Sequence, residues 1–144
     1  MESYFESYDN IGVHSLMLRD EPRVSKYREA ILNSKSLFKD KIVLDVGSGT
    51  GLLSLFSAQA GAKHVYAIEA SDGIYELSKA IVEANNMESK ITIIHGQVEK
   101  VELPVERVDI IVSEWMGMYL IVRKEKWIFD FLDPKIDPKN PIVI

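Results

Sequence analysis

The stretch Val43-Leu44-Asp45-Val46-Gly47-Ser48-Gly49-Thr50-Gly51-Leu52 decides the fold of this chain. A short apolar run ends at three alternate glycines and is followed by apolar residues at helical spacing, which predicts a buried strand, a tight turn and a helix. Glycines in such a turn let a ligand approach the backbone closely. The stretch therefore predicts a ligand-binding turn.

Three further runs resemble the first, at residues 64–68, 91–95 and 108–112, and the segments after the first two have helical spacing. Alternating strands and helices predict right-handed crossovers and an α/β fold, in which helices cover both faces of a parallel sheet. We expect one more helix at 24–32, before the sheet. Ligands of such folds bind outside the carboxyl ends of the strands, so functional residues should lie where each strand ends.

Composition narrows the class of protein. The 144 residues, 47% of them hydrophobic, suit one globular domain. A formal net charge of -5 argues against a dedicated nucleic-acid-binding module, and the absence of cysteine excludes thiolate chemistry. Because the chain has no long apolar run and does not begin like a secretory signal, we expect an intracellular protein without a membrane span.

The spacing of the glycines bears on the ligand. A dinucleotide fingerprint would need its third glycine at position 52, where this chain has Leu52. Asp45, two residues before Gly47, is typical of methyltransferases that use S-adenosylmethionine (AdoMet). A carboxylate tolerates their cationic sulfonium better than it tolerates a pyrophosphate.

Acidic residues also follow the other strands. Glu69 can accept hydrogen bonds from ribose hydroxyls, which suits AdoMet and NAD equally, so a nicotinamide-dependent dehydrogenase stays open. Glu99 could accept from an adenine amino group. Glu114, beside the apolar Trp115 and Met116, could hold a cationic group at the mouth of the crevice.

Taken together, these residues resemble the type I protein arginine methyltransferases, from Tyr4 to about Leu120. The family-specific pieces are Tyr4-Phe5-x-x-Tyr8, Gly12-x-His14-x-x-Met17-Leu18-x-Asp20-x-x-Arg23, the stretch 43–51, Ile68-Glu69, Val98-Glu99-x-Val101-x-Leu103-Pro104 and Ser113-Glu114-Trp115-Met116-Gly117. The resemblance implies a Rossmann-like, class I AdoMet-dependent methyltransferase fold.

The resemblance also implies roles for single residues. Arg23 would pair with the AdoMet carboxylate, Glu69 would hold the ribose, and Val98 with Glu99 would hold the adenine. Glu114 would be the catalytic carboxylate that binds the substrate guanidinium, and we expect no metal. The other expected cofactor contacts are His14, Met17, Asp45, Gly47, Gly49 and Gly51, and the expected lid or substrate contacts are Tyr4, Phe5, Tyr8, Trp115 and Met116.

The implied reaction is methyl transfer from AdoMet to arginine nitrogens of proteins, which leaves S-adenosylhomocysteine (AdoHcy). The family suggests asymmetric dimethylation of histone tails or Gly-Arg-rich RNA-binding proteins, a homodimer, and residence in the nucleus or cytoplasm. It suggests no direct binding of nucleic acid and no membrane.

The chain departs from the family after residue 120. Arg123 stands where a second glutamate is expected, and most of a C-terminal β-barrel is missing. We therefore expect an arm and helix at 1–40, an AdoMet-binding domain at 41–120, and a tail at 121–144 that could be a barrel fragment. The departure keeps an alternative open, a catalytically incomplete AdoMet-binding paralogue or partner subunit.

Overall fold

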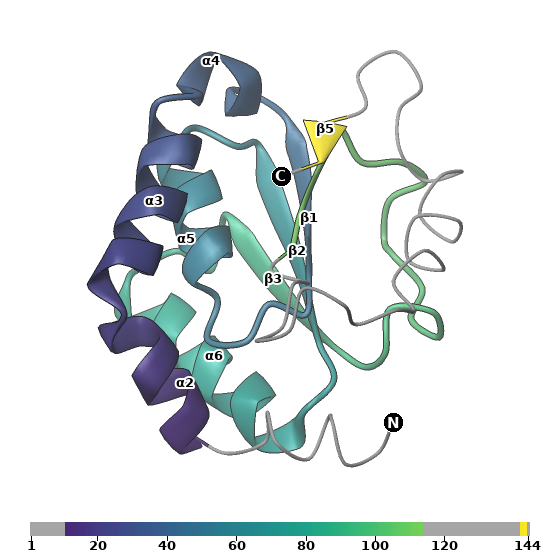
Figure 1. Cartoon of the computed structure of the whole chain (residues 1–144). Coiled ribbons are helices and arrows are strands. Elements are labelled where there is room, and N and C mark those ends of the chain that lie inside the picture. The colour runs from purple at the N-terminus through teal and green to yellow at the C-terminus, as the bar shows by residue number, and fades with distance from the viewer. Residues whose placement is uncertain (1–10, 114–141, 144) are drawn as a thin grey trace.

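A single parallel sheet forms the centre of the molecule in the computed structural model, which describes residues 11–113 and 142–143 (Figure 1). The strands lie in the order β3-β2-β1-β4-β5. The four apolar runs each contribute a strand, as predicted, although regular pairing in the fourth run begins only at residue 110. The strands are β1 (Ile42–Val46), β2 (His64–Glu69), β3 (Ile91–His95), β4 (Ile110–Val112) and the short β5 (Ile142–Val143).

Helices precede and connect the strands. They are α2 (Ile11–Arg19), α3 (Glu21–Leu32), α4 (Lys35–Phe38), α5 (Leu52–Gln59) and α6 (Asp72–Ala84). The helix expected at 24–32 begins three residues earlier than predicted. The side chain of Asp20 accepts a hydrogen bond from the Arg23 amide at 3.4 Å, and Pro22 lies in the first turn, where its missing N–H costs nothing.

Chain direction explains how the sheet is covered. From β1 through α5, β2 and α6 to β3, the chain moves toward one edge of the sheet, so right-handed crossovers place both helices on the same face. The return from β3 to β4 must then cross the opposite face. In the described residues this crossing is the segment 96–109, which contains no helix (Figure 1). Helices were expected on both faces, and the part of the chain that the structure describes has them on one.

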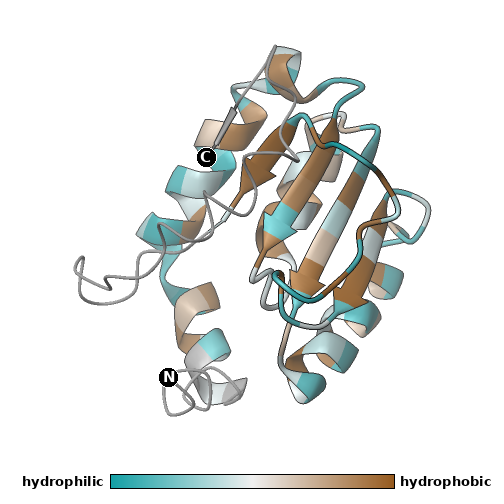
Figure 2. Ribbon diagram, turned by 90° about the vertical axis from the view of Figure 1, so that its right-hand side faces the viewer, coloured by the Kyte–Doolittle hydropathy of each residue, from teal (hydrophilic) through white to brown (hydrophobic). Residues whose placement is uncertain are grey.

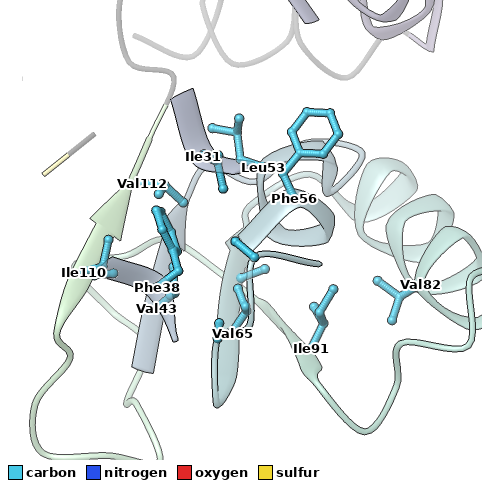
Figure 3. Close-up of a cluster of buried hydrophobic side chains, with 13 residues drawn as sticks. Ile31, Phe38, Val43, Leu53, Phe56, Val65, Val82, Ile91, Ile110 and Val112 are labelled. Atoms are coloured by element: carbon cyan, nitrogen blue, oxygen red, sulfur yellow. The ribbon is translucent and has the colours of Figure 1, made fainter. Parts of the chain in front are cut away.

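Alternate residues of the strands build two cores. Val43, Val65 and Ile110 face the helices and pack with Phe38 and Phe56 (Figure 3). Leu44, Ile68 and Ile111 face the other side and pack with Val98 and Val108 from the crossing segment and its end. Figure 2 views the sheet from this side, with the crossing segment in front of the strands. Burial on both faces explains why the strands are continuous apolar runs.

Asp45 is the exception in β1, because it lies on the helix-facing side with Val43 and is 1% exposed. The carboxyl ends of β1 and β2 end side by side, with Val46 opposite Ile68. This edge of the sheet carries the candidate site. No helix among the described residues is long and apolar enough to cross a membrane.

Candidate functional site

The glycine turn has the backbone geometry that its sequence predicts. Gly47, Gly49 and Gly51 have φ angles of 67°, 56° and 89°, which residues with a side chain rarely adopt. The Ser48 amide donates to the Ile68 carbonyl at 2.9 Å, and this bond ties the turn to the end of β2. The turn is therefore fixed between β1 and β2 and presents backbone atoms to its surroundings.

A cavity of about 200 Å³ opens beside this turn. Four parts of the chain line it: helix α2, the start of α3, the segment from the end of β1 into α5, and the end of β2. The cavity brings together most of the expected cofactor contacts, namely His14, Met17, Arg23, Asp45, Gly47, Gly49 and Glu69. Its wall combines two carboxylates, a guanidinium, an imidazole and apolar groups.

Glu69 joins two parts of the site through its carboxylate. One oxygen accepts a hydrogen bond from the Gly49 amide at 2.7 Å, and the other accepts from the Ser71 amide at 2.9 Å. Since each carboxylate oxygen has two lone pairs, both oxygens can accept a further hydrogen bond. The arrangement holds the glycine turn in place and leaves room to accept from hydroxyl groups.

Asp45 is the most perturbed acid of the site. Burial raises the pKa of its carboxyl from 3.8 to about 7, against the hydrogen bonds from Ser54, which lower it, and with the negative charge of Glu69, which raises it further. The Ser54 hydroxyl donates to the carboxylate at 2.7 Å. A buried acid with a strongly raised pKa on a cavity wall is the kind of group that marks a functional site.

Helix α2 closes the cavity through His14, which is 8% exposed. Its ring packs on Gly49: a Cβ atom there would lie 3.1 Å from His14 Cε1. Arg23 anchors the end of the helix, because its Nη1 donates to the Met17 carbonyl at 2.9 Å. The guanidinium also lies over the ring of Tyr27, 5.6 Å from its centroid. The position of α2 therefore depends on two residues of the cavity wall.

Replacing Gly49 with Ala should weaken ligand binding at this site and destabilise the protein by about 1–2 kcal/mol. The alanine would be held at a positive φ angle, and its methyl group would press on His14. Gly73 is the matched control: it lies in the first turn of α6, with nothing within 4 Å of an added Cβ, so Gly73→Ala should not destabilise. Urea unfolding of both variants measures the difference, and equal stabilities would contradict the role of Gly49.

Three expected cofactor contacts do not line the cavity. Gly51 lies within the turn and caps α5, and Val98 is buried in the second core. Glu99 is exposed on the turn that follows β3. The expected residues Tyr4, Phe5, Tyr8, Glu114, Trp115 and Met116, and also Arg123, lie outside the described residues.

The structure adds residues that the sequence analysis missed. Ser54 contacts Asp45, and the Ser113 hydroxyl donates to the Val46 carbonyl at 2.9 Å, which ties the end of β4 to the end of β1. A serine at an apolar position of a helix was the available signal for Ser54. Among the described residues no three His, Cys, Asp or Glu side chains form a group that could hold a metal ion.

A glycine turn between two parallel strands, with a buried acid two residues before it and a second acid at the next strand end, is typical of one class of protein, the methyltransferase domains. Residues 43–130 match a family described as "Methyltransferase domain". The chain belongs to the protein arginine N-methyltransferase family, of which it represents part of the methyltransferase domain. The cofactor class follows at the level of the family, which is AdoMet-dependent.

Individual relatives agree with this assignment. The chain is 53% identical over 134 residues to protein arginine N-methyltransferase 8-B of Danio rerio, and 54% identical over 118 residues to protein arginine N-methyltransferase 1 of Schizosaccharomyces pombe. It covers 32% and 34% of those proteins, which cover 87% and 82% of this chain. The chain thus spans about a third of the length of these relatives.

Solved structures show the same fold. The Trypanosoma brucei PRMT1 enzyme-prozyme heterotetrameric complex with AdoHcy has a TM-score of 0.86 and 42% identity, over 95% of this chain and 43% of that one. Arabidopsis thaliana protein arginine methyltransferase 10 has a TM-score of 0.87 and 40% identity, over 94% and 38%. The predicted class I methyltransferase fold is therefore confirmed.

Proposed function

We propose that this chain binds AdoMet in the cavity beside the glycine turn and, in the protein to which it belongs, takes part in methyl transfer to arginine side chains of proteins. The observation that carries the proposal is the composition of the cavity wall. Arg23, Asp45 and Glu69 converge there from three different elements. They offer one cation and two carboxylates to a ligand that carries a carboxylate, positive charges and hydroxyl groups.

Each residue has a part in this proposal. Arg23 pairs with the AdoMet carboxylate, Asp45 faces its positive charge, and Glu69 accepts from the ribose hydroxyls with the lone pairs that Gly49 and Ser71 leave free. The glycine turn lets the ligand approach the backbone, with His14 and Met17 as the wall on the side of α2. Val98 and Glu99, which lie on the turn after β3 and outside the cavity wall, hold the adenine. AdoMet supplies an activated methyl group on its sulfonium.

The acceptor in the proposal is an arginine guanidinium. This group stays protonated at working pH, and its delocalised charge makes its nitrogens poor nucleophiles. Glu114 accepts hydrogen bonds from the guanidinium, draws the positive charge toward itself and orients one terminal nitrogen. Trp115, Met116, Tyr4, Phe5 and Tyr8 complete the substrate side.

The substrates, the product, the oligomeric state and the location that we propose are those implied by the resemblance to the family. The substrates are histone tails or Gly-Arg-rich proteins, the product is asymmetric dimethylarginine, and the protein works as a homodimer in the nucleus or cytoplasm. Residues 1–40 cover the cofactor, 41–120 bind it, and 121–144 are a tail that includes a piece of the barrel domain.

A second candidate function is that of a partner subunit that binds AdoMet without catalysis. Arg123 favours this second candidate. A second glutamate would accept hydrogen bonds from the substrate guanidinium, whereas an arginine has no acceptor and repels it. One of the similar structures is an enzyme-prozyme heterotetrameric complex, so a pairing of two kinds of subunit exists among the proteins that this chain resembles.

One experiment separates the two candidates. The whole protein to which this chain belongs is incubated with AdoMet labelled on its methyl group and a Gly-Arg-rich peptide. We expect label on arginine, and no label with Glu114→Gln. Label on lysine, or none while AdoMet still binds, would reject the arginine methyltransferase, and the second of these results would favour the partner subunit.

A further inference from the structure

A buried pair outside the expected contacts lies directly behind the cavity. Ser54 is the third residue of α5 and is 0% exposed, and its hydroxyl donates to Asp45 at 2.7 Å. The residue at the N-cap of α5 is Gly51, which has no side chain to accept from the first turn. Asp45 of the neighbouring strand β1 accepts hydrogen bonds from Ser54 in this first turn instead. The start of α5 therefore lies against a carboxylate.

The charged and titratable groups around Asp45 come from each element that lines the cavity. Glu69 of β2, His14 of α2 and Arg23 of α3 line the same cavity as Asp45. Glu69 adds to the effect of burial and raises the pKa of Asp45, whereas Ser54 lowers it. With a pKa of about 7, Asp45 is divided between the neutral acid and the carboxylate near neutral pH in the protein without ligand.

We propose that the capture of AdoMet is coupled to the loss of a proton from Asp45, and that Ser54 is a positioning residue whose hydroxyl favours the carboxylate form of Asp45. This inference rests on the proposed function, since it takes AdoMet as the ligand of the cavity. The positive charge of the ligand favours the carboxylate over the acid. The O–H bond of the Asp45 carboxyl breaks, its proton passes to the buffer, and the Ser54 hydroxyl remains the donor to the carboxylate.

The coupling predicts how affinity depends on pH. Below pH 7 the ligand must first displace the proton, so affinity is low. Above pH 7 the carboxylate is already present and affinity levels off. Between pH 6 and pH 8 the affinity of the wild type should rise by about tenfold. With Ser54→Ala one donor to the carboxylate is lost, so the neutral acid persists to higher pH and the rise becomes larger.

The test is calorimetric titration of the chain with AdoMet alone, in buffers of different ionisation enthalpy, from pH 6 to pH 8. The dependence of the observed heat on the buffer gives the number of protons released. For the wild type at pH 7 we expect a contribution of about half a proton that Asp45→Asn lacks. Ser54→Ala should release more than the wild type at this pH.

Ser57 supplies the matched control. It lies one turn further along α5, is 0% exposed, and donates its hydroxyl to the Leu53 carbonyl within the helix, away from Asp45. Ser57→Ala should release as many protons as the wild type. Circular dichroism of each variant checks that it is folded.

The outcomes separate this inference from the proposed function. If folded wild-type protein gives no heat and no thermal shift with AdoMet, the proposed function fails. If AdoMet binds but Asp45→Asn releases as many protons as the wild type, the coupling is rejected. If Ser54→Ala and Ser57→Ala release the same number, Ser54 has no positioning role. The coupling to Asp45 would be retained in that case, and the part of the proposal that concerns Ser54 would be overturned.

Discussion

In the absence of ligand, the wild type should lose stability relative to Asp45→Asn as the pH rises from 4 to 8. The native state binds the proton of Asp45 more tightly than the unfolded chain does, because burial raises the pKa from 3.8 to about 7. Between these values the native state holds more protons than the unfolded state, so the free energy of unfolding falls with rising pH. The stabilisation is complete below about pH 4 and is lost as the pH passes 7.

The size of the effect follows from the shift in pKa and is about 4 kcal/mol over the whole window. Urea unfolding of both proteins at several pH values measures it as the difference between their two profiles. Asp40→Asn makes the same chemical change at an exposed position whose positive φ angle of 61° suits asparagine, so its profile should follow the wild type. Parallel profiles for the wild type and Asp45→Asn would contradict the assignment.

Glu69→Ala should lower the affinity for AdoMet by about 5- to 150-fold, which corresponds to about 1–3 kcal/mol. The substitution removes the acceptors of the Gly49 and Ser71 amides, so the glycine turn loses one of its ties to the end of β2 and keeps the bond between Ser48 and Ile68. It also removes the acceptor that we propose for the ribose hydroxyls. The loosened turn and the missing acceptor both weaken the binding of AdoMet. We therefore expect this loss of affinity to be among the largest for any single substitution in the described residues.

Calorimetric titration with AdoMet measures the loss, and Glu83→Ala is the control, since Glu83 is exposed on α6 and distant in sequence from the turn. Glu69→Gln keeps one carbonyl oxygen as an acceptor and should fall between Glu69→Ala and the wild type. An affinity of Glu69→Ala equal to that of the wild type would refute the role of Glu69.

The strands and the glycine turn could be predicted from the sequence because their signals are local. A continuous apolar run such as β1 predicts a strand that is buried on both faces, and the structure shows such a strand. The glycines at 47, 49 and 51 predict positive φ angles, and all three have them in the structure. The predicted start of α3 is three residues too late, because the apolar spacing begins at Val24, whereas the residue that caps the helix is Asp20.

The rest depends on contacts between elements that lie far apart in the sequence. The crossing segment 96–109 has no periodic pattern, so nothing in it predicts that it covers the second face of the sheet. The tie between Ser113 and Val46 spans 67 residues. The partnership of Ser54 with Asp45 requires that α5 fold back on β1, and the sequence shows only a serine at an apolar position. The strand ends predicted where the site lies, and the packing of α2 and α5 determined which groups meet there.

The most direct test of the account is a calorimetric comparison of AdoMet and NAD as ligands of this chain. The glycine spacing, with Leu52 at the place of a third dinucleotide glycine, and the two carboxylates of the cavity predict saturable, one-to-one binding of AdoMet and no binding of NAD. Binding of NAD, or folded protein that binds neither ligand, would contradict the assignment of the cavity as an AdoMet site.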